Sequence, residues 1–406
     1  MTAQIFHGLG IYWARYCGMY EMTEYPDLPK LNSSPEVKMR AWQNWAARET
    51  KLRALLGLYI MDGVIAQFSG NPTFAQHMCN PLPLPSSELA FEATSPEAWL
   101  REMGSQRDQS IRFHDAFCSL FSPSCDLPNL ENIGSTFYIK VVLEGVRSLV
   151  YQSYRKEGSP VGVPQKTEIS RVLAHLRDYI TTTNSLSSID RCIALIRWHA
   201  ICLDTVSDTA RGTRRLCYSY NINQQIFGGG VREERNIDPE RWLRSHVARR
   251  ALLHATMIQE IASQLPLGSA HNIYIPGAVF AAATTYAAFA LAGVSRVVLP
   301  TVVDWKSVVR LDSNLTASQA AAEGGDGFGG FGMESPPARS MMKKEGLRDT
   351  LSYLAGNFAQ SGTPGDVRNL AYDLSSVQIL LRGLSMQWGV ALEMEQVVQA
   401  WILRCE

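Results

Sequence analysis

The chain has 406 residues, and its 38 Lys and Arg residues balance 38 Asp and Glu residues, so the formal net charge is zero. Hydrophobic residues make up 46% and charged residues 19% of the chain, which excludes a disordered or collagen-like protein. The zero net charge also argues against a chain that binds nucleic acid through a strongly basic surface of its own.

The predicted elements are almost all helices. Ile5, Leu9, Tyr12, Trp13 and Tyr16 recur at helical spacing, and this abrupt helical start suggests a piece of a longer protein. A long helix is expected from the Ser34-Pro35-Glu36 start signal to about residue 68. Further helices are expected near 106–121, 134–157, 167–183, 188–209, 238–264, 276–294, 341–360 and 364–405, the last with a break at Gly383 or Gly389 left open, and the best strand candidate is 297–303. The sequence therefore predicts an all-α fold with long loops.

Three regions are expected along the chain. Residues 1–311 form a single multi-helical domain, 312–340 form a flexible linker rich in Gly, Ser and Pro, and 341–406 form C-terminal helices that pack on the same body. The stretch 272–295 has no charged residue, but it is dominated by Ala, Gly and Thr. It favours a buried central helix over a membrane span.

The cysteines indicate free thiols. None of the eight is paired at C-x2-C spacing, and the closest two, Cys118 and Cys125, are separated by six residues. A structural zinc site usually needs the tighter spacing. The cysteine spacing therefore predicts no metal ligands. The sequence also predicts no cofactor and no catalytic residues in this chain.

The long helix carries a motif of five residues: Trp42, Trp45, Glu49, Arg53 and Asp62. This motif resembles the regulatory domain of fungal transcription factors, also called the middle homology region. Later segments, RWHAICLD from Arg197 and HNIYIPGAVFAAATTYAAFALAG from His271, resemble further helices of the same domain. The resemblance covers most of residues 1–310 and implies that Glu49, Arg53 and Asp62 are structural.

The resemblance also implies a nuclear location and a role in controlling transcription. In this family the regulatory domain accompanies two-cysteine two-histidine zinc fingers or binuclear zinc clusters. Zinc and sequence-specific DNA binding are then expected only in a module N-terminal to Met1. The implied partners of this chain are a small apolar effector, transcriptional co-regulators or a second copy in a homodimer, and no membrane.

A ligand pocket is predicted between the long helix and the Ala-rich helix 276–294. Trp45 and Tyr59 would supply aromatic walls, facing Phe280 and Tyr286 across space left by small residues. Two alternatives remain open. One is a helical enzyme acting on an apolar small molecule, with Asp204, Asp208 and His199 as its candidate residues. The other is an interaction module with a dry core and an exposed apolar patch of several hundred Å².

Overall fold

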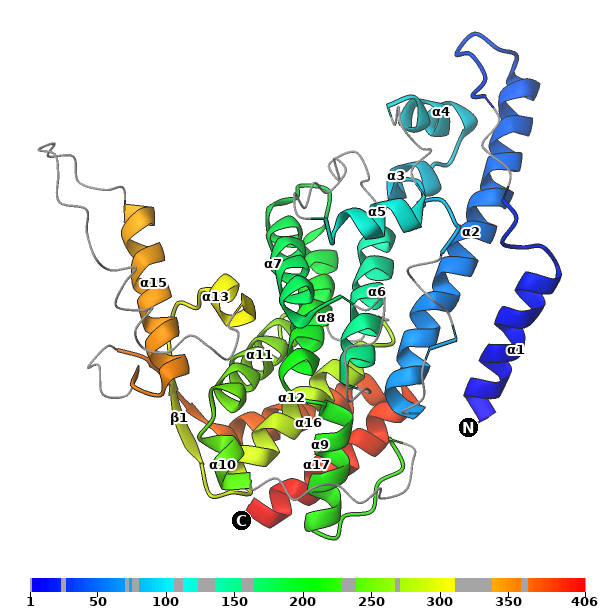
Figure 1. Cartoon of the computed structure of the whole chain (residues 1–406). Helices are drawn as coiled ribbons and strands as arrows, with labels where there is room; N and C mark the ends of the chain where they lie inside the picture. The colour runs from blue at the N-terminus through cyan, green and yellow to red at the C-terminus, as the bar shows by residue number, and fades with distance from the viewer. Residues whose placement is uncertain are drawn as a thin grey trace, which may run out of the picture. The chain divides into compact units, whose positions relative to one another are not determined.

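The computed structural model describes residues 2–22, 27–69, 73–74, 80–105, 112–122, 136–154, 164–227, 239–266, 271–310, 338–358 and 364–405. Within these ranges the protein is built from helices with two short strands, as Figure 1 shows. The predicted all-α fold is therefore confirmed.

The chain divides into two compact units. Unit 1 comprises Met1–Val172, Leu176–Leu195 and Phe227–Gly230, and unit 2 comprises Leu173–His175, Ile196–Ile226 and Val231–Glu406. The helices that begin in unit 1 are α1 (Thr2–Tyr16), α2 (Pro35–Ser69), α3 (Glu88–Phe91), α4 (Pro96–Ser105), α5 (Phe113–Ser119), α6 (Thr136–Tyr154), α7 (Lys166–Thr182) and α8 (Ser188–Val206).

Unit 1 is organised along α2, a helix of 35 residues. Its first half packs on α3 and α4 through a cluster in which the Trp45 and Trp99 rings lie 5.6 Å apart. Its second half packs against α6, and α1 lies along the same helix (Figure 1). The buried side chains of α2 lie between Trp45 and Ala66, so this part of the helix holds the packing contacts of unit 1 described here.

Unit 2 is organised around α12 (Ile275–Ala290), the Ala-rich helix. Nearly all of its residues are buried, because α11 (His246–Ala262), α16 (Leu370–Ser385) and α17 (Gly389–Cys405) pack against it. A helix that is apolar all round is stable only when it is enclosed in this way. The remaining helices are α9 (Thr209–Ser219), α10 (Pro239–Leu243), α13 (Trp305–Arg310) and α15 (Ala338–Ala355).

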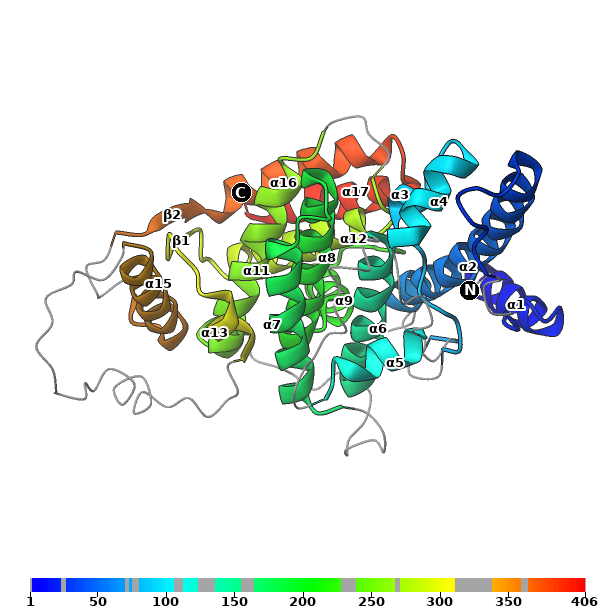
Figure 2. The same cartoon turned by 90° about the horizontal axis from the view of Figure 1, so that it is seen from above.

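The two strands of unit 2 pair with each other. β1 (Arg296–Leu299) runs antiparallel to β2 (Asp366–Asn369), with Arg296 opposite Asn369 (Figure 2). β2 was missed in the sequence because its four residues, DVRN, show no strand pattern. Its extended conformation comes from the hydrogen bonds to β1.

Helix caps correct several predicted boundaries. The expected helix 188–209 ends at Val206, and Asp208 begins α9 by accepting a hydrogen bond from the Arg211 amide. The expected helix 238–264 is two helices, because Ser245 caps the start of α11. Of the two break points considered in the segment 364–405, Gly383 and Gly389, the structure has the break before Gly389, between α16 and α17. In each case a short polar residue or glycine interrupts an apolar periodicity that continues across the break.

The predicted regions 1–311, 312–340 and 341–406 stay a prediction. The helices α15, α16 and α17 belong to the same unit as α11 and α12. The predicted linker 312–340 falls largely on residues outside the described ranges, and α15 begins at Ala338.

One described helix meets the length and composition of a membrane span. This helix is α2, and 44% of its most apolar window is buried inside the protein. Core helices of soluble proteins have the same length and composition, so these two properties alone are weak evidence for a span.

Candidate functional site

The motif helix begins where the sequence signals it. The Ser34 hydroxyl accepts a hydrogen bond from the Val37 amide at 3.5 Å, and Pro35 occupies the first helical position. Proline is tolerated there because its missing amide has no partner in the first turn. From this start, residues four apart along α2 lie above one another, which aligns Trp45, Glu49 and Arg53 on one side of the helix.

Glu49 is fully buried on this side of α2. Its Oε1 accepts hydrogen bonds from Arg53 Nε at 2.9 Å and from the Ser86 amide at 3.0 Å. Its Oε2 accepts a hydrogen bond from the Ser86 hydroxyl at 3.2 Å. A buried carboxylate needs such partners, because its desolvation would otherwise cost several kcal/mol (about 3–5).

Arg53 extends the network to α3. It donates hydrogen bonds to Glu88 Oε2 at 2.7 Å and to the Ser86 carbonyl at 2.8 Å, and its guanidinium lies 4.0 Å from the centre of the Phe91 ring. Glu88 in turn accepts hydrogen bonds from Thr136 Oγ1 and the Phe137 amide at the start of α6. Burial raises the pKa of the Glu88 carboxyl, but the hydrogen bonds and charge of Arg53 outweigh burial and hold it below its ordinary value.

The far end of the motif contacts α1 and α6. Asp62 Oδ1 lies 3.4 Å from His7 Nε2. The neighbouring Gly63 carbonyl accepts a hydrogen bond from Arg147, which also lies 3.8 Å from Glu144. Glu49, Arg53 and Asp62 therefore connect helices within unit 1.

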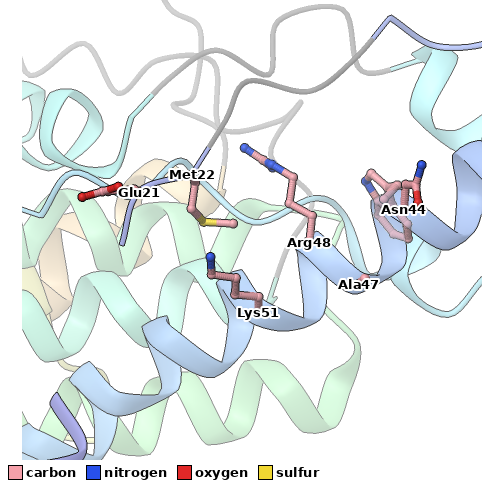
Figure 3. Close-up of a pocket in the computed structure, with 7 residues that line it drawn as sticks. Glu21, Met22, Asn44, Ala47, Arg48 and Lys51 are labelled. Carbon is pink, nitrogen blue, oxygen red and sulfur yellow. The ribbon is translucent and has the colours of Figure 1, made fainter. Parts of the chain in front are cut away.

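A pocket opens on a different side of α2, and Figure 3 shows its lining. It has a volume of about 420 Å³ and is lined by Glu21, Met22, Asn44, Trp45, Ala47, Arg48 and Lys51. Asn44, Ala47, Arg48 and Lys51 follow the i, i+3, i+4, i+7 spacing that places side chains on one helix face. Pockets for small molecules generally have volumes of about 300–1,000 Å³.

The pocket combines positive charge with an apolar wall. Arg48 and Lys51 extend from α2 toward Met22, and Glu21 is the one acidic side chain of the lining (Figure 3). Trp45 is buried, and its Nε1 has no hydrogen-bond partner among the described residues. The lining could therefore hold a small molecule with an anionic group and an apolar part, because arginine and lysine bind carboxylates and phosphates.

Two of the four residues of the predicted pocket lie in unit 1, and the other two lie in unit 2. Trp45 lines the pocket in unit 1, and Tyr59 is buried in the same unit. In unit 2, the Phe280 ring stacks on Trp401 at 5.6 Å, and the Tyr286 hydroxyl donates a hydrogen bond to Gln259 Oε1 at 2.6 Å. The shared pocket of all four stays a prediction.

Sequence reasoning missed the charged part of the pocket. Arg48 and Lys51 have the spacing of a solvated helix face, and Glu21 and Met22 lie just before a Pro-containing loop. No motif marks these residues. The only available signal was their position beside Trp45, which was expected to line a pocket.

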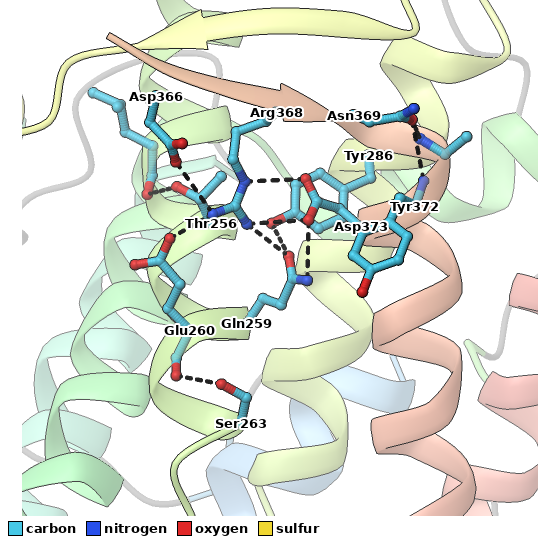
Figure 4. A network of polar contacts seen from close by, with 12 residues as sticks. Thr256, Gln259, Glu260, Ser263, Tyr286, Asp366, Arg368, Asn369, Tyr372 and Asp373 are labelled. Carbon is cyan, nitrogen blue, oxygen red and sulfur yellow. Dashed lines mark hydrogen bonds and ion pairs between the residues drawn. The ribbon is translucent and has the colours of Figure 1, made fainter.

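Unit 2 contains a second polar cluster, drawn in Figure 4. Arg368 from β2 donates hydrogen bonds to Asp373 at 3.1 Å and to Glu260 at 2.7 Å, and the Gln259 amide nitrogen donates to Asp373 at 3.2 Å. Burial lowers the pKa of Arg368, but the surrounding acids outweigh burial and raise it. Each charge in this cluster has an opposite partner, which is typical of a structural network.

The residues of the enzyme alternative come from the second half of α8 and the start of α9. Asp204 accepts a hydrogen bond from Thr209 Oγ1 at 2.9 Å, whereas Asp208 caps α9 and shares no helix with Asp204. The two carboxylates are separated by the end of α8 at Val206. His199 is buried, with its Nδ1 3.0 Å from His254 Nδ1 and its ring 4.6 Å from that of Trp305.

Within the described ranges, no group of three or more His, Cys, Asp or Glu side chains is arranged to hold a metal ion.

Comparison with known proteins gives no match for this chain among family models, curated proteins or solved structures.

Proposed function

We propose that this chain is the regulatory domain of a fungal nuclear transcription factor. In this proposal a zinc-bearing module outside the chain binds DNA, and the helical body responds to an effector or a co-regulator. The chain itself has no catalytic role. The support comes from the motif of α2 and from the helical architecture that surrounds it.

The single observation that carries the effector role is the pocket beside Trp45. It lies on the same helix as the motif, next to the network that joins α2 to α3 and α6. A ligand that contacts Arg48 and Lys51 would stabilise the arrangement of α2 to which it binds, and α2 organises unit 1. An effector acts when its affinity differs between two arrangements of a protein.

The pocket favours an amphipathic anion over the purely apolar effector that the resemblance implies. Its two cations would bind a carboxylate or phosphate, and the Trp45 ring with Met22 would contact an apolar part. A purely apolar molecule would make no charge-assisted contact with either cation.

The proposal is tested by native mass spectrometry of the chain purified from a fungal host, first under mild and then under denaturing conditions. We expect a small anionic molecule that is lost on denaturation. Lys51→Met should reduce its occupancy about tenfold or more, because one charge-assisted contact contributes about 1.5–3 kcal/mol. Lys344→Met, which removes an exposed lysine of α15 in unit 2, should leave the occupancy unchanged.

A reporter gene assay in the full-length protein addresses transcription. Lys51→Met should weaken the response to the identified molecule, and Lys344→Met should not. A chain that binds no molecule under mild conditions, and a reporter that responds equally in both variants, would contradict the effector role.

A further inference from the structure

The helix α1 carries large apolar side chains on its exposed side. Six of them are between 47% and 73% exposed: Ile5, Phe6, Leu9, Tyr12, Trp13 and Tyr16. We call these six residues the α1 stripe. The opposite face of α1 is already used, because His7, Ile11 and Ala14 are buried. Helix α1 is therefore apolar on two faces, a pattern that is typical of a helix with neighbours on both sides.

The stripe has the spacing of a helix-pairing seam. Ile5, Leu9, Tyr12 and Tyr16 follow one another at intervals of four, three and four residues, which is the a and d pattern of a coiled coil. Phe6 and Trp13 flank this seam on one side. Three of the aromatic rings contact one another. The ring centres of Trp13 and Tyr16 lie 5.8 Å apart, edge to face, and those of Tyr12 and Tyr16 lie 6.3 Å apart, stacked.

The apolar surface continues from the stripe into a groove between α1 and α2. This groove has a volume of about 270 Å³ and is lined by Gly10, Trp13, Ala14, Cys17, Met19, Ala54, Leu55 and Leu58. No charged side chain lines it. A bulky side chain from a partner helix would find apolar contacts there on both walls.

The area of this surface fits a dimer interface. Six side chains of this size that are about 60% exposed present roughly 600 Å² or more of apolar surface. The largest apolar patch of an ordinary monomer is about 300–600 Å². Two stripes packed together would bury about 1,200 Å² or more, and the grooves would add to this, which reaches the size of a specific protein interface at about 1,200–2,000 Å².

Charge favours a second copy as the occupant. Arg15 is the only Lys, Arg, Asp or Glu residue in α1, and it lies outside the stripe. Two identical stripes can therefore meet without like-charge repulsion, and an isologous interface needs a surface that complements itself. An uncharged seam of a and d residues meets this condition.

We infer that the chain forms a homodimer in which the α1 stripes of two copies pack together across a two-fold axis. The α1–α2 groove of each copy receives bulky side chains from its partner. This inference does not rest on the proposed function, because it depends only on the exposed face of α1.

Sedimentation equilibrium of the purified chain tests this inference. We expect the wild-type chain to be a dimer at micromolar concentration. The double variant Leu9→Lys, Tyr16→Lys should weaken the dimer at least about 100-fold, because it places four positive charges in one apolar interface. A wild-type chain that stays monomeric up to about 100 µM would overturn the inference.

The matched control carries the same substitutions elsewhere. Leu403 is 61% and Tyr372 is 72% exposed, on α17 and α16. The double variant Leu403→Lys, Tyr372→Lys should keep the wild-type dimer, and loss of the dimer in this control would place the interface elsewhere. A dimer that survives in the α1 variant would also overturn the inference. Circular dichroism checks that both variants keep the helical fold.

Hydrogen exchange gives a second, local readout. The amides of α1 should exchange more slowly at concentrations where the wild type is a dimer than at concentrations where it is a monomer. In the Leu9→Lys, Tyr16→Lys variant, the amides of α1 should exchange at the faster rate at both concentrations. Equal exchange of the wild type at both concentrations would contradict a dimer formed through α1.

Discussion

Glu49 and Arg53 form the part of the motif on which unit 1 depends most directly. The carboxylate of Glu49 is fully buried, and Arg53 joins it to Glu88 and to the start of α6. Such a pair costs desolvation energy when it forms, so its net contribution to stability is modest. Removal of one partner has a larger effect, because the other charge is then left buried.

Arg53→Ala should destabilise the protein by about 3–5 kcal/mol, since it leaves the buried Glu49 carboxylate without its cation. Urea unfolding followed by circular dichroism measures this change. Arg40→Ala, at an exposed position on the same helix, should change the free energy of unfolding by less than about 0.5 kcal/mol. Equal effects of the two substitutions would show that the buried pair is not essential.

The lowered pKa of Glu88 predicts a pH dependence of stability. Its carboxyl has a pKa below the ordinary value of 4.5 in the folded protein. The unfolded chain therefore takes up the proton first as the pH falls, and folding loses stability from about pH 4.5 downward through the folded pKa. Above this pH range the ionised Glu88 carboxylate makes its full contribution to the stability of the folded protein.

Glu88→Gln should flatten the fall in melting temperature between pH 5 and pH 3, while lowering the melting temperature at pH 7. Thermal melts across this range measure both effects. If the variant and the wild type lose stability in parallel as the pH falls, Glu88 is not the group responsible.

At the scale of the elements, α2 is the helix on which the other parts of unit 1 are placed. One side carries the pocket, one side carries the Glu49 network, and the C-terminal half meets α6. The close approach of α6 depends on Gly63. A Cβ atom at this position would overlap Glu144 Oε2 and lie 3.5 Å from the Arg147 guanidinium.

Gly63→Ala should destabilise the protein by about 1–3 kcal/mol, because Glu144 is buried and its carboxylate cannot move without disturbing Arg147. Gly57 offers a matched control on the same helix, since a Cβ there would meet no atom within 4 Å. Gly57→Ala should stabilise the protein by about 0.5–1 kcal/mol through helix propensity. Chemical denaturation of the two variants should therefore give changes of opposite sign.

At the scale of the whole molecule, association through α1 would link stability to concentration. A partner that binds only the folded state stabilises it by mass action. The pocket beside Trp45 and the α1 stripe share no residue, since the pocket is lined by residues of α2 and by Glu21 and Met22. Ligand occupancy and dimer formation can therefore be measured separately.

The melting temperature of the wild-type chain should rise by a few degrees over a hundredfold increase in concentration, because dimers must dissociate before they unfold. The Leu9→Lys, Tyr16→Lys variant should melt at one temperature throughout. Differential scanning calorimetry at two concentrations distinguishes these outcomes. A wild-type melting temperature that is independent of concentration would contradict linkage to dimer formation.

The sequence by itself determined the fold class and the position of most helices in this protein. Apolar periodicity predicted α2, α6, α7 and α12 because each buries side chains at helical spacing over several turns. The i,i+4 spacing of Glu49 and Arg53 likewise suits the ion pair that they form, since the two residues are neighbours on any helix.

Only the tertiary structure decided which residues share a site. From the sequence alone, Arg48 and Lys51 have the spacing of solvated helix residues. In the structure, Glu21 and Met22 line the same pocket. β2 exists only because β1 lies beside it. In both cases the deciding contact joins residues that are far apart in the sequence, and a pattern along the chain reports only on neighbours within a turn or two.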